Sequence, residues 1–282
     1  MTGLVLEGGA MRGLFTAGVL DVMMENGVET DAAIGVSAGA VFGCNYKSKQ
    51  IGRVLRYNLR FCRDKRYCSF RSLLKTGDLY GAEFCYRTLP TQLDLFDYEG
   101  YASHPMPFYV VCTDAETGEA VVHRCDHGRD EEMEWFRASA SMPVVSRPVE
   151  IGGRKLLDGG IADSILIRQM ENLGCERNIV ILTQPEGYVK KPAKGLPIMR
   201  WLMRRYPAVA DAMAVRHERY NETISYLHEQ EKAGNVLVIR PPVKLEAGHV
   251  EHDAAKLQAA YDIGRAEGEK QLEAMRAFLK GE

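Results

Sequence analysis

Short runs of apolar residues, each bounded by polar or turn-forming residues, recur along this chain. Most of the runs are continuous rather than alternating, which is typical of strands buried on both faces of a largely parallel sheet. A further short strand is expected between the turn at Gly152-Gly153 and Asp158. The other predicted strands are residues 4–6, 32–34, 108–112, 120–123, 179–182 and 236–239.

Segments with helical patterns lie between these strands. Residues 14–25 place their apolar side chains on one helical face, and Asn26-Gly27 supplies a stop. Strands that alternate with helices predict an α/β fold, a layered and mostly parallel sheet flanked by helices. The other predicted helices are residues 38–46, 131–141, 166–173, 208–232 and 253–280, of which the last two are charge-rich and expected outside the sheet.

The chain length and composition favour one large domain. The 282 residues contain 46% hydrophobic and 26% charged residues, which is ordinary for a globular protein. No internal repeat or low-complexity linker divides the sequence. We therefore expect a single domain over residues 1–282, with the recognisable motifs in residues 3–185 and a helical, less diagnostic part in residues 186–282.

Charge and cysteine content narrow the class of protein. A net charge of −2 gives no support to nucleic-acid binding. The seven cysteines are scattered and no secretory signal is visible, so we expect reduced thiols, a cytoplasmic location and no metal or other cofactor. Asp114–Gly118 could coordinate a cation, but a turn between two strands is the simpler interpretation.

Gly35-Val36-Ser37-Ala38-Gly39 follows one predicted strand and opens a predicted helix. This is the context of a G-x-S-x-G nucleophile elbow, in which a serine is presented at a sharp turn between strand and helix. Gly35 and Gly39 permit the close approach of the two elements, and the helix that begins at Ala38 directs its N–H groups toward the reacting oxygen. The alternative is a Gly/Ser turn that only caps a helix.

A glycine-rich loop follows the first predicted strand, in the segment Glu7-Gly8-Gly9-Ala10-Met11-Arg12-Gly13. Successive glycines let backbone N–H groups converge on an anion, either a phosphate or the oxyanion of a tetrahedral intermediate. The spacing is not that of a dinucleotide-binding G-x-G-x-x-G, and no Walker loop is present. Together with Ser37, the loop indicates an acyl-transfer site.

A nucleophilic serine needs a base, and Asp158 is the favoured candidate. Two glycines follow Asp158 and let the chain turn away, which exposes the carboxylate to a neighbouring side chain. An Asp-Gly turn that closes a hairpin is the alternative. The histidines are weaker candidates: His217 and His228 are expected on the solvated face of a charged helix, and His249 and His252 in a loop.

Four segments, in order, resemble the patatin-like phospholipase family of bacterial type: Gly8–Gly13, Gly35–Gly39, Ala138–Pro143 and Asp158–Gly160. The resemblance implies a Ser–Asp dyad without histidine, in which Ser37 is the nucleophile and Asp158 accepts its proton in a dry pocket. It also implies both residues above the strand ends of a helix-flanked sheet.

The resemblance assigns the oxyanion N–H donors to Gly8, Gly9, Ala10, Gly13 and Ala38. Ala10 replaces a glycine of the plant members, and as an alanine it is expected to avoid positive φ. Arg12 is the basic position of the family, where it orients the loop or attracts an anionic head group.

The resemblance implies hydrolysis of lipid acyl esters through an acyl-serine intermediate, as a phospholipase A or lysophospholipase. An acyltransferase would use the same acyl-enzyme. A catalytically idle lipid-binding scaffold is a third interpretation, which the intact serine, aspartate and glycine loop argue against. Two basic, aromatic segments offer peripheral membrane contact as an alternative to ordinary helix faces: residues 53–71 as one helix, and residues 196–206 as a lid.

Overall fold

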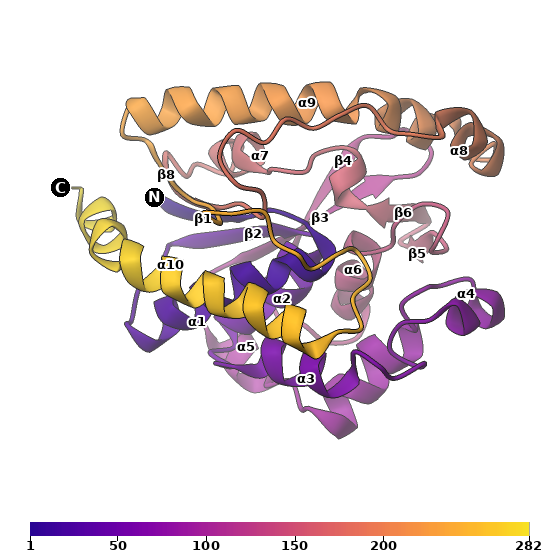
Figure 1. Cartoon of the computed structure of the whole chain (residues 1–282), viewed down its shortest axis with the longest axis horizontal. Helices are drawn as coiled ribbons and strands as arrows, with labels where there is room; N and C mark the ends of the chain where they lie inside the picture. Colours follow the sequence, from indigo (N-terminus) through magenta and orange to yellow (C-terminus); the bar gives the residue numbers. More distant parts are fainter. Residues whose placement is uncertain (282) are drawn as a thin grey trace.

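A computed structural model describes residues 1–281 as an eight-stranded sheet with helices on both faces (Figure 1). The strand order is β5-β6-β3-β2-β1-β7-β8, and β4 also pairs with β3. The strands are β1 (Thr2–Leu6), β2 (Ala32–Val36), β3 (Phe108–Asp114), β4 (Ala120–Cys125), β5 (Val149–Ile151), β6 (Arg154–Asp158), β7 (Arg177–Ile181) and β8 (Val236–Ile239).

The centre of the sheet is parallel, and one side of it is antiparallel. β3, β2, β1, β7 and β8 run parallel, whereas β4 and β6 are antiparallel to β3, and β5 forms a hairpin with β6. The α/β fold and the mostly parallel sheet are therefore confirmed. The sequence pattern missed β5, because this strand has three residues and its central Glu150 is exposed.

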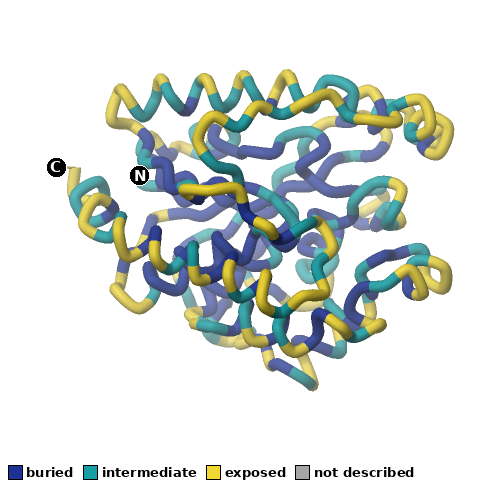
Figure 2. Tube along the Cα trace, in the orientation of Figure 1, coloured by how far each residue is buried: buried dark blue, intermediate teal, exposed yellow. Residues whose placement is uncertain are grey.

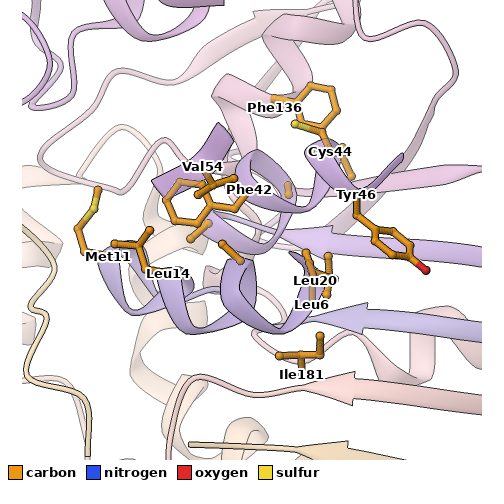
Figure 3. Close-up of a cluster of buried hydrophobic side chains, with 14 of the residues drawn as sticks. Leu6, Met11, Leu14, Leu20, Phe42, Cys44, Tyr46, Val54, Phe136 and Ile181 are labelled. Carbon is orange, nitrogen blue, oxygen red and sulfur yellow. The ribbon is translucent and has the colours of Figure 1, made fainter. Parts of the chain in front are cut away.

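Successive residues of the central strands pack on opposite faces, as the continuous apolar runs predict. Leu4 and Leu6 belong to the cluster that includes side chains of α1, α2 and α10, whereas Val5 belongs to the cluster on the α7 and α9 face. Figure 3 shows part of the first cluster, with Leu6 and Ile181 from neighbouring strands.

The helices on these two faces include those predicted at residues 14–25, 38–46, 131–141, 166–173, 208–232 and 253–280. The α-helices are α1 (Gly13–Glu25), α2 (Ala38–Lys47), α3 (Arg53–Phe61), α4 (Phe70–Thr76), α5 (Tyr98–Ser103), α6 (Glu131–Ser139), α7 (Ile167–Asn172), α8 (Leu196–Leu202), α9 (Pro207–Lys232) and α10 (Ala254–Lys280). A π-helix, η2, spans Phe84–Leu93, and two 3₁₀ turns span Ala10–Arg12 (η1) and Gly159–Ile161 (η3).

The prediction of one helix over residues 53–71 is wrong. The segment forms α3 and the start of α4, separated by a turn in which the N–H of Arg66 donates to Oδ1 of Asp64 at 2.8 Å. This side-chain bond offers the backbone an alternative to continuing the helix.

The long helices α9 and α10 lie on opposite faces of the sheet, with their outward sides exposed (Figures 1 and 2). α10 packs closely on α1, so that a Cβ added at Gly264 would lie 2.0 Å from the carbonyl oxygen of Phe15. Only a glycine allows this crossing distance. Within residues 1–281, no helix combines the length and apolar character that crossing a membrane requires.

Candidate active site

Ser37 lies at the sharp turn between β2 and α2. Its backbone has φ 55° and ψ −125°, a conformation that is costly for a residue with a Cβ atom. The turn depends on its flanking glycines, because a Cβ at Gly39 would lie 2.3 Å from the carbonyl oxygen of Leu6. The strand, turn and helix of a nucleophile elbow are thus present around Ser37.

The end of α6 holds the backbones of both predicted catalytic residues. The N–H of Ser37 donates to Oγ of Ser139 at 2.9 Å, and Oγ of Ser139 donates to the carbonyl oxygen of Val111 at 2.6 Å. Two residues further on, the carbonyl oxygen of Ser141 accepts a bond from the N–H of Asp158 at 2.8 Å. In the sequence, the segment Ala138–Pro143 was identified only through the family resemblance. These contacts show that it fixes the backbones of Ser37 and Asp158.

Asp158 lies at the end of β6, paired with Cys112 of β3, and only 7% of the residue is exposed. Its Oδ1 accepts a bond from the N–H of Gly160 at 2.8 Å. Burial raises the pKa of the carboxyl group, and the nearby Ser37 hydroxyl, the bond from the Gly160 N–H and the charge of Arg216 oppose that rise. A poorly hydrated carboxylate with a raised pKa is a stronger base toward an alcohol than a solvated one.

The glycine-rich loop lies beside Ser37, since a Cβ added at Gly8 would be 3.0 Å from Cβ of Ser37. The expectation that Ala10 avoids positive φ is wrong, because its φ is 49°. Here the chain passes from extended Gly9 into the 3₁₀ turn Ala10–Arg12, which the bond from the N–H of Arg12 to the Gly9 oxygen closes at 3.2 Å. The left-handed conformation costs about 1–2 kcal/mol.

Glu7 is a buried carboxylate beneath this loop. It accepts bonds from Oγ1 of Thr183 at 3.0 Å and from the Tyr220 hydroxyl at 3.0 Å, and it also accepts the N–H of Thr183. Burial raises the pKa of Glu7, and these bonds together with Arg12 and Lys190 oppose the rise. The sequence analysis did not assign Glu7 a role, although an acidic residue at the end of an apolar strand was a visible signal.

Two cavities meet at Ser37, and they differ in chemistry. They share Ala10, Ser37 and Met142, and their volumes are about 110 Å³ and about 410 Å³. The smaller cavity is mostly apolar and lies among α2, α3, η2 and α6. Its lining includes Val41, Phe42, Tyr57, Tyr86, Leu89, Phe96, Met133 and Phe136, and also Arg53. The larger cavity is the more polar of the two and is called the polar cavity below; its lining includes Asp158, Arg12, Lys190 and Arg216.

The positions of four histidines can be compared with the sequence predictions. His217 and His249 line the polar cavity, so the expectation of a solvated His217 is wrong: its side chain is 18% exposed, because α9 turns this position toward the cavity. His228 pairs with Glu186, and Nδ1 of His252 contacts the carbonyl oxygen of Cys62. Within residues 1–281, no histidine forms a hydrogen bond with Ser37 or Asp158.

Three further predictions concern Asp114–Gly118, residues 196–206 and Gly13. Oδ1 of Asp114 accepts a bond from the N–H of Glu116 at 2.8 Å, which confirms a turn between β3 and β4. In the segment 196–206, Met199 of α8 faces the polar cavity, whereas Trp201 is 65% exposed. Gly13 begins α1 beside Ala38, at 2.9 Å between an added Cβ and that of Ala38.

Two family models match this sequence. The model described as patatin-like phospholipase matches residues 4–170, which is more than half of the chain. A second model, a domain of unknown function designated DUF6363, matches residues 206–280.

Known proteins match this chain over most of its length but at low sequence identity. Protein YjjU of Escherichia coli is 25% identical over 270 residues, which cover 93% of this chain and 74% of YjjU. Lysophospholipase NTE1 of Candida glabrata is 24% identical over 294 residues, covering 97% of this chain but 16% of the relative, so the chain spans about a sixth of that protein. Among solved structures, VipD from Legionella pneumophila aligns with a TM-score of 0.47 and 13% identity over 97% of this chain and 67% of that chain.

Proposed function

Because the chain belongs to the patatin-like phospholipase family, we propose that it hydrolyses acyl esters of lipids, as a phospholipase A or lysophospholipase, through Ser37 and Asp158. One observation carries this proposal. Ser37 and the buried carboxyl group of Asp158 line the same polar cavity, and Ser37 lies where that cavity meets an apolar one. An ester with an apolar acyl chain and a polar alcohol suits that arrangement.

In the acylation step, Oγ of Ser37 attacks the ester carbonyl carbon while Asp158 accepts the hydroxyl proton. The N–H groups of Gly8, Gly9 and Ala10 and the N-terminus of α2 at Ala38 supply stabilisation for the negative charge that develops on the carbonyl oxygen. The expected contribution of Gly13 is not part of this set, because its N–H already donates to the carbonyl oxygens of Ala10 and Met11. Protonated Asp158 then gives its proton to the leaving alcohol. Water repeats these steps on the acyl-serine and releases the fatty acid.

Labelling with a fluorophosphonate probe tests the proposed nucleophile. The wild-type protein should be modified at Ser37, and the Ser37→Ala variant should not react. Mass spectrometry of the labelled peptide identifies the site. A protein that binds lipids without reacting would contradict the proposal, as would labelling at another serine.

We also propose that the enzyme contacts the lipid surface through two short helices with exposed apolar and basic residues. Phe70 and Leu74 of α4 are 79% and 87% exposed, and Ile198 and Trp201 of α8 are 67% and 65% exposed. Apolar side chains next to basic ones are typical of segments that rest on anionic membranes.

Vesicles of anionic phospholipid provide the test of membrane contact. The Phe70→Ser, Leu74→Ser double variant should cosediment more weakly than the wild type because it removes apolar area available for insertion. The Arg204→Glu, Arg205→Glu double variant tests the basic contribution next to α8. Unchanged cosedimentation of both variants would rule out these helices as the contact.

A further inference from the structure

Four cationic side chains line the polar cavity beside Ser37: Arg12, Lys190, Lys191 and Arg216. None of them forms an ion pair with any carboxylate in the part of the chain that the structure describes. Unpaired cations inside a cavity are costly unless a ligand supplies the counter-charge. These groups therefore mark a place for an anion.

Lys190 is held in position by α9. Its backbone N–H donates to Oδ1 of Asn221 at 2.9 Å, and its carbonyl oxygen accepts Nδ2 of Asn221 at 3.0 Å. Nζ of Lys190 lies 4.2 Å from the ring centroid of Tyr220. Burial and the nearby charges of Arg216 and Arg12 lower the pKa of Lys190 to about 8, and the charge of Glu7 opposes this shift.

Arg216 of α9 and Arg12 of the glycine-rich loop line the same cavity. Nε of Arg216 donates to the carbonyl oxygen of Gly160, two residues after Asp158. Nε of Arg12 is buried without a hydrogen-bond partner among the described residues. A buried donor without a partner is unusual in a folded protein and favours a missing acceptor at this place.

The carboxylates that line the cavity do not balance these cations. They are Glu7 and Asp158. Glu7 is engaged by Thr183 and Tyr220, and its pKa is raised. Asp158 faces Ser37, and its pKa is raised as well. Two carboxylates against four cationic side chains leave the cavity with an excess of positive charge.

We propose that Arg12, Lys190 and Arg216 bind the phosphate group of the substrate lipid while its acyl chain occupies the apolar cavity. This inference rests on the proposed function and specifies its substrate as a phosphate-bearing acyl ester. Arginine and lysine are the side chains best suited to phosphate oxygens. Lys190 and Arg216 lie outside the residues matched by the patatin-like model, so the C-terminal part of the chain supplies head-group recognition.

A binding measurement on the Ser37→Ala protein tests the site without any catalysis. Isothermal titration with decyl phosphate should give saturable binding, and Lys190→Gln should weaken it by about tenfold or more. Lys190→Arg should restore most of the affinity. The matched control is Lys194→Gln, which removes the same charge from an exposed position of the same loop and should leave the affinity unchanged.

A kinetic measurement distinguishes a lipid head group from free phosphate. The ratio of kcat/KM for lysophosphatidic acid to that for the monoacylglycerol with the same acyl chain should exceed one, and Lys190→Gln should lower the ratio by about tenfold. If inorganic phosphate binds as tightly as decyl phosphate and the ratio is one, the site takes free phosphate and the head-group assignment is overturned.

The two proposals fail in different ways. If fluorophosphonate does not label Ser37, the proposed hydrolase activity is wrong, whether or not decyl phosphate binds. If Ser37 is labelled but neither decyl phosphate affinity nor the kinetic ratio responds to Lys190→Gln, only the phosphate site is wrong. The melting temperature of Lys190→Gln, compared with that of Lys194→Gln, identifies a loss caused by misfolding.

Discussion

Asp158 combines deep burial with a role that requires a charged carboxylate. Burial raises its pKa, while the Gly160 N–H and the charge of Arg216 keep the charged form accessible. A carboxylate whose pKa is raised, but which can still ionise, is suited to accept a proton from an alcohol. The burial that makes Asp158 a stronger base also makes its charged form unfavourable for the stability of the fold.

We predict that Asp158→Asn lowers kcat by about a thousandfold, because asparagine cannot accept the Ser37 proton. Hydrolysis of a p-nitrophenyl ester measures the change. Circular dichroism should show an intact fold, since the asparagine oxygen can still accept the Gly160 N–H. Loss of activity in His249→Ala or His252→Ala, with activity retained in Asp158→Asn, would replace the dyad with a triad.

The raised pKa also fixes the direction of the pH dependence. Activity should fall as the pH drops through the pKa of folded Asp158, which lies above its ordinary value. The folded state binds the proton more tightly than the unfolded state, so this carboxyl group favours folding below its unfolded pKa of about 3.9 and loses that contribution as the pH rises through its folded pKa. Asp158→Asn should therefore unfold at a higher urea concentration than the wild type at pH 7, but not at pH 3.

We predict that Ser139→Ala lowers the free energy of unfolding by about 2 kcal/mol and also lowers kcat. The alanine leaves the N–H of Ser37 without its acceptor, in a backbone conformation that already stores strain. Urea unfolding and ester hydrolysis measure the two effects. Ser141→Ala is the matched control, because that hydroxyl only donates to the Arg137 oxygen of its own helix turn and should cost less than about 1 kcal/mol.

At the scale of elements, the apolar cavity lies between helices that the sequence pattern predicts and a π-helix that it does not. The π-helix η2 contains Pro90, which lacks the N–H of a regular helix, and contributes Tyr86 and Leu89 to the lining. The predicted helix α2 contributes Val41 and Phe42 from the opposite side. A regular helical pattern identified α2, whereas the irregular wall had no periodic signal to find.

We predict that Val41→Phe shifts the preference of the enzyme toward shorter acyl chains, because the larger side chain fills part of the apolar cavity. The ratio of kcat/KM for the p-nitrophenyl laurate to that for the butyrate should fall by about tenfold, given about 0.8 kcal/mol per buried methylene. The control is Leu95→Phe at a position that is 64% exposed and outside the cavity. An unchanged ratio in Val41→Phe would place the acyl chain elsewhere.

The site residues that the sequence predicts lie in local motifs. The residues that it missed take part in contacts between distant parts of the chain. Ser37, Asp158 and the Gly8–Gly13 loop each stand next to glycines whose spacing is visible in the sequence. Glu7 and Tyr220 are 213 positions apart and are joined by a hydrogen bond. No pattern along the chain indicates such a pair, because it forms only when α9 packs on the sheet.

At the scale of the whole molecule, α10 and α1 connect the two ends of the chain. Their crossing requires Gly264 against Phe15, and Tyr261 of α10 donates to Asp21 of α1. We propose that residues 1–282 unfold as one cooperative unit, with no separate C-terminal domain. Trp135 in α6 and Trp201 in α8 provide fluorescent reporters for the two parts of the chain.

We predict that Gly264→Leu lowers the free energy of unfolding by about 3 kcal/mol, because the side chain forces the two helices apart. Thermal unfolding, followed through each tryptophan in a variant lacking the other, should shift equally for both reporters. The control Glu273→Leu, at a side chain that is 83% exposed on α10, should change stability by less than about 0.5 kcal/mol. Two separate transitions would contradict the single unit.

The hydrogen bond between Tyr220 and Glu7 limits which C-terminal halves this N-terminal half can accept. In a chimera with the tail of a relative, the loop beside Ser37 would keep its glycines but lose a donor beneath it unless the incoming helix carries a hydroxyl at the matching position. The buried carboxylate would then be left with the Thr183 donors of its own half. Exchange of tails between such proteins therefore has to preserve this pair or replace both of its members together.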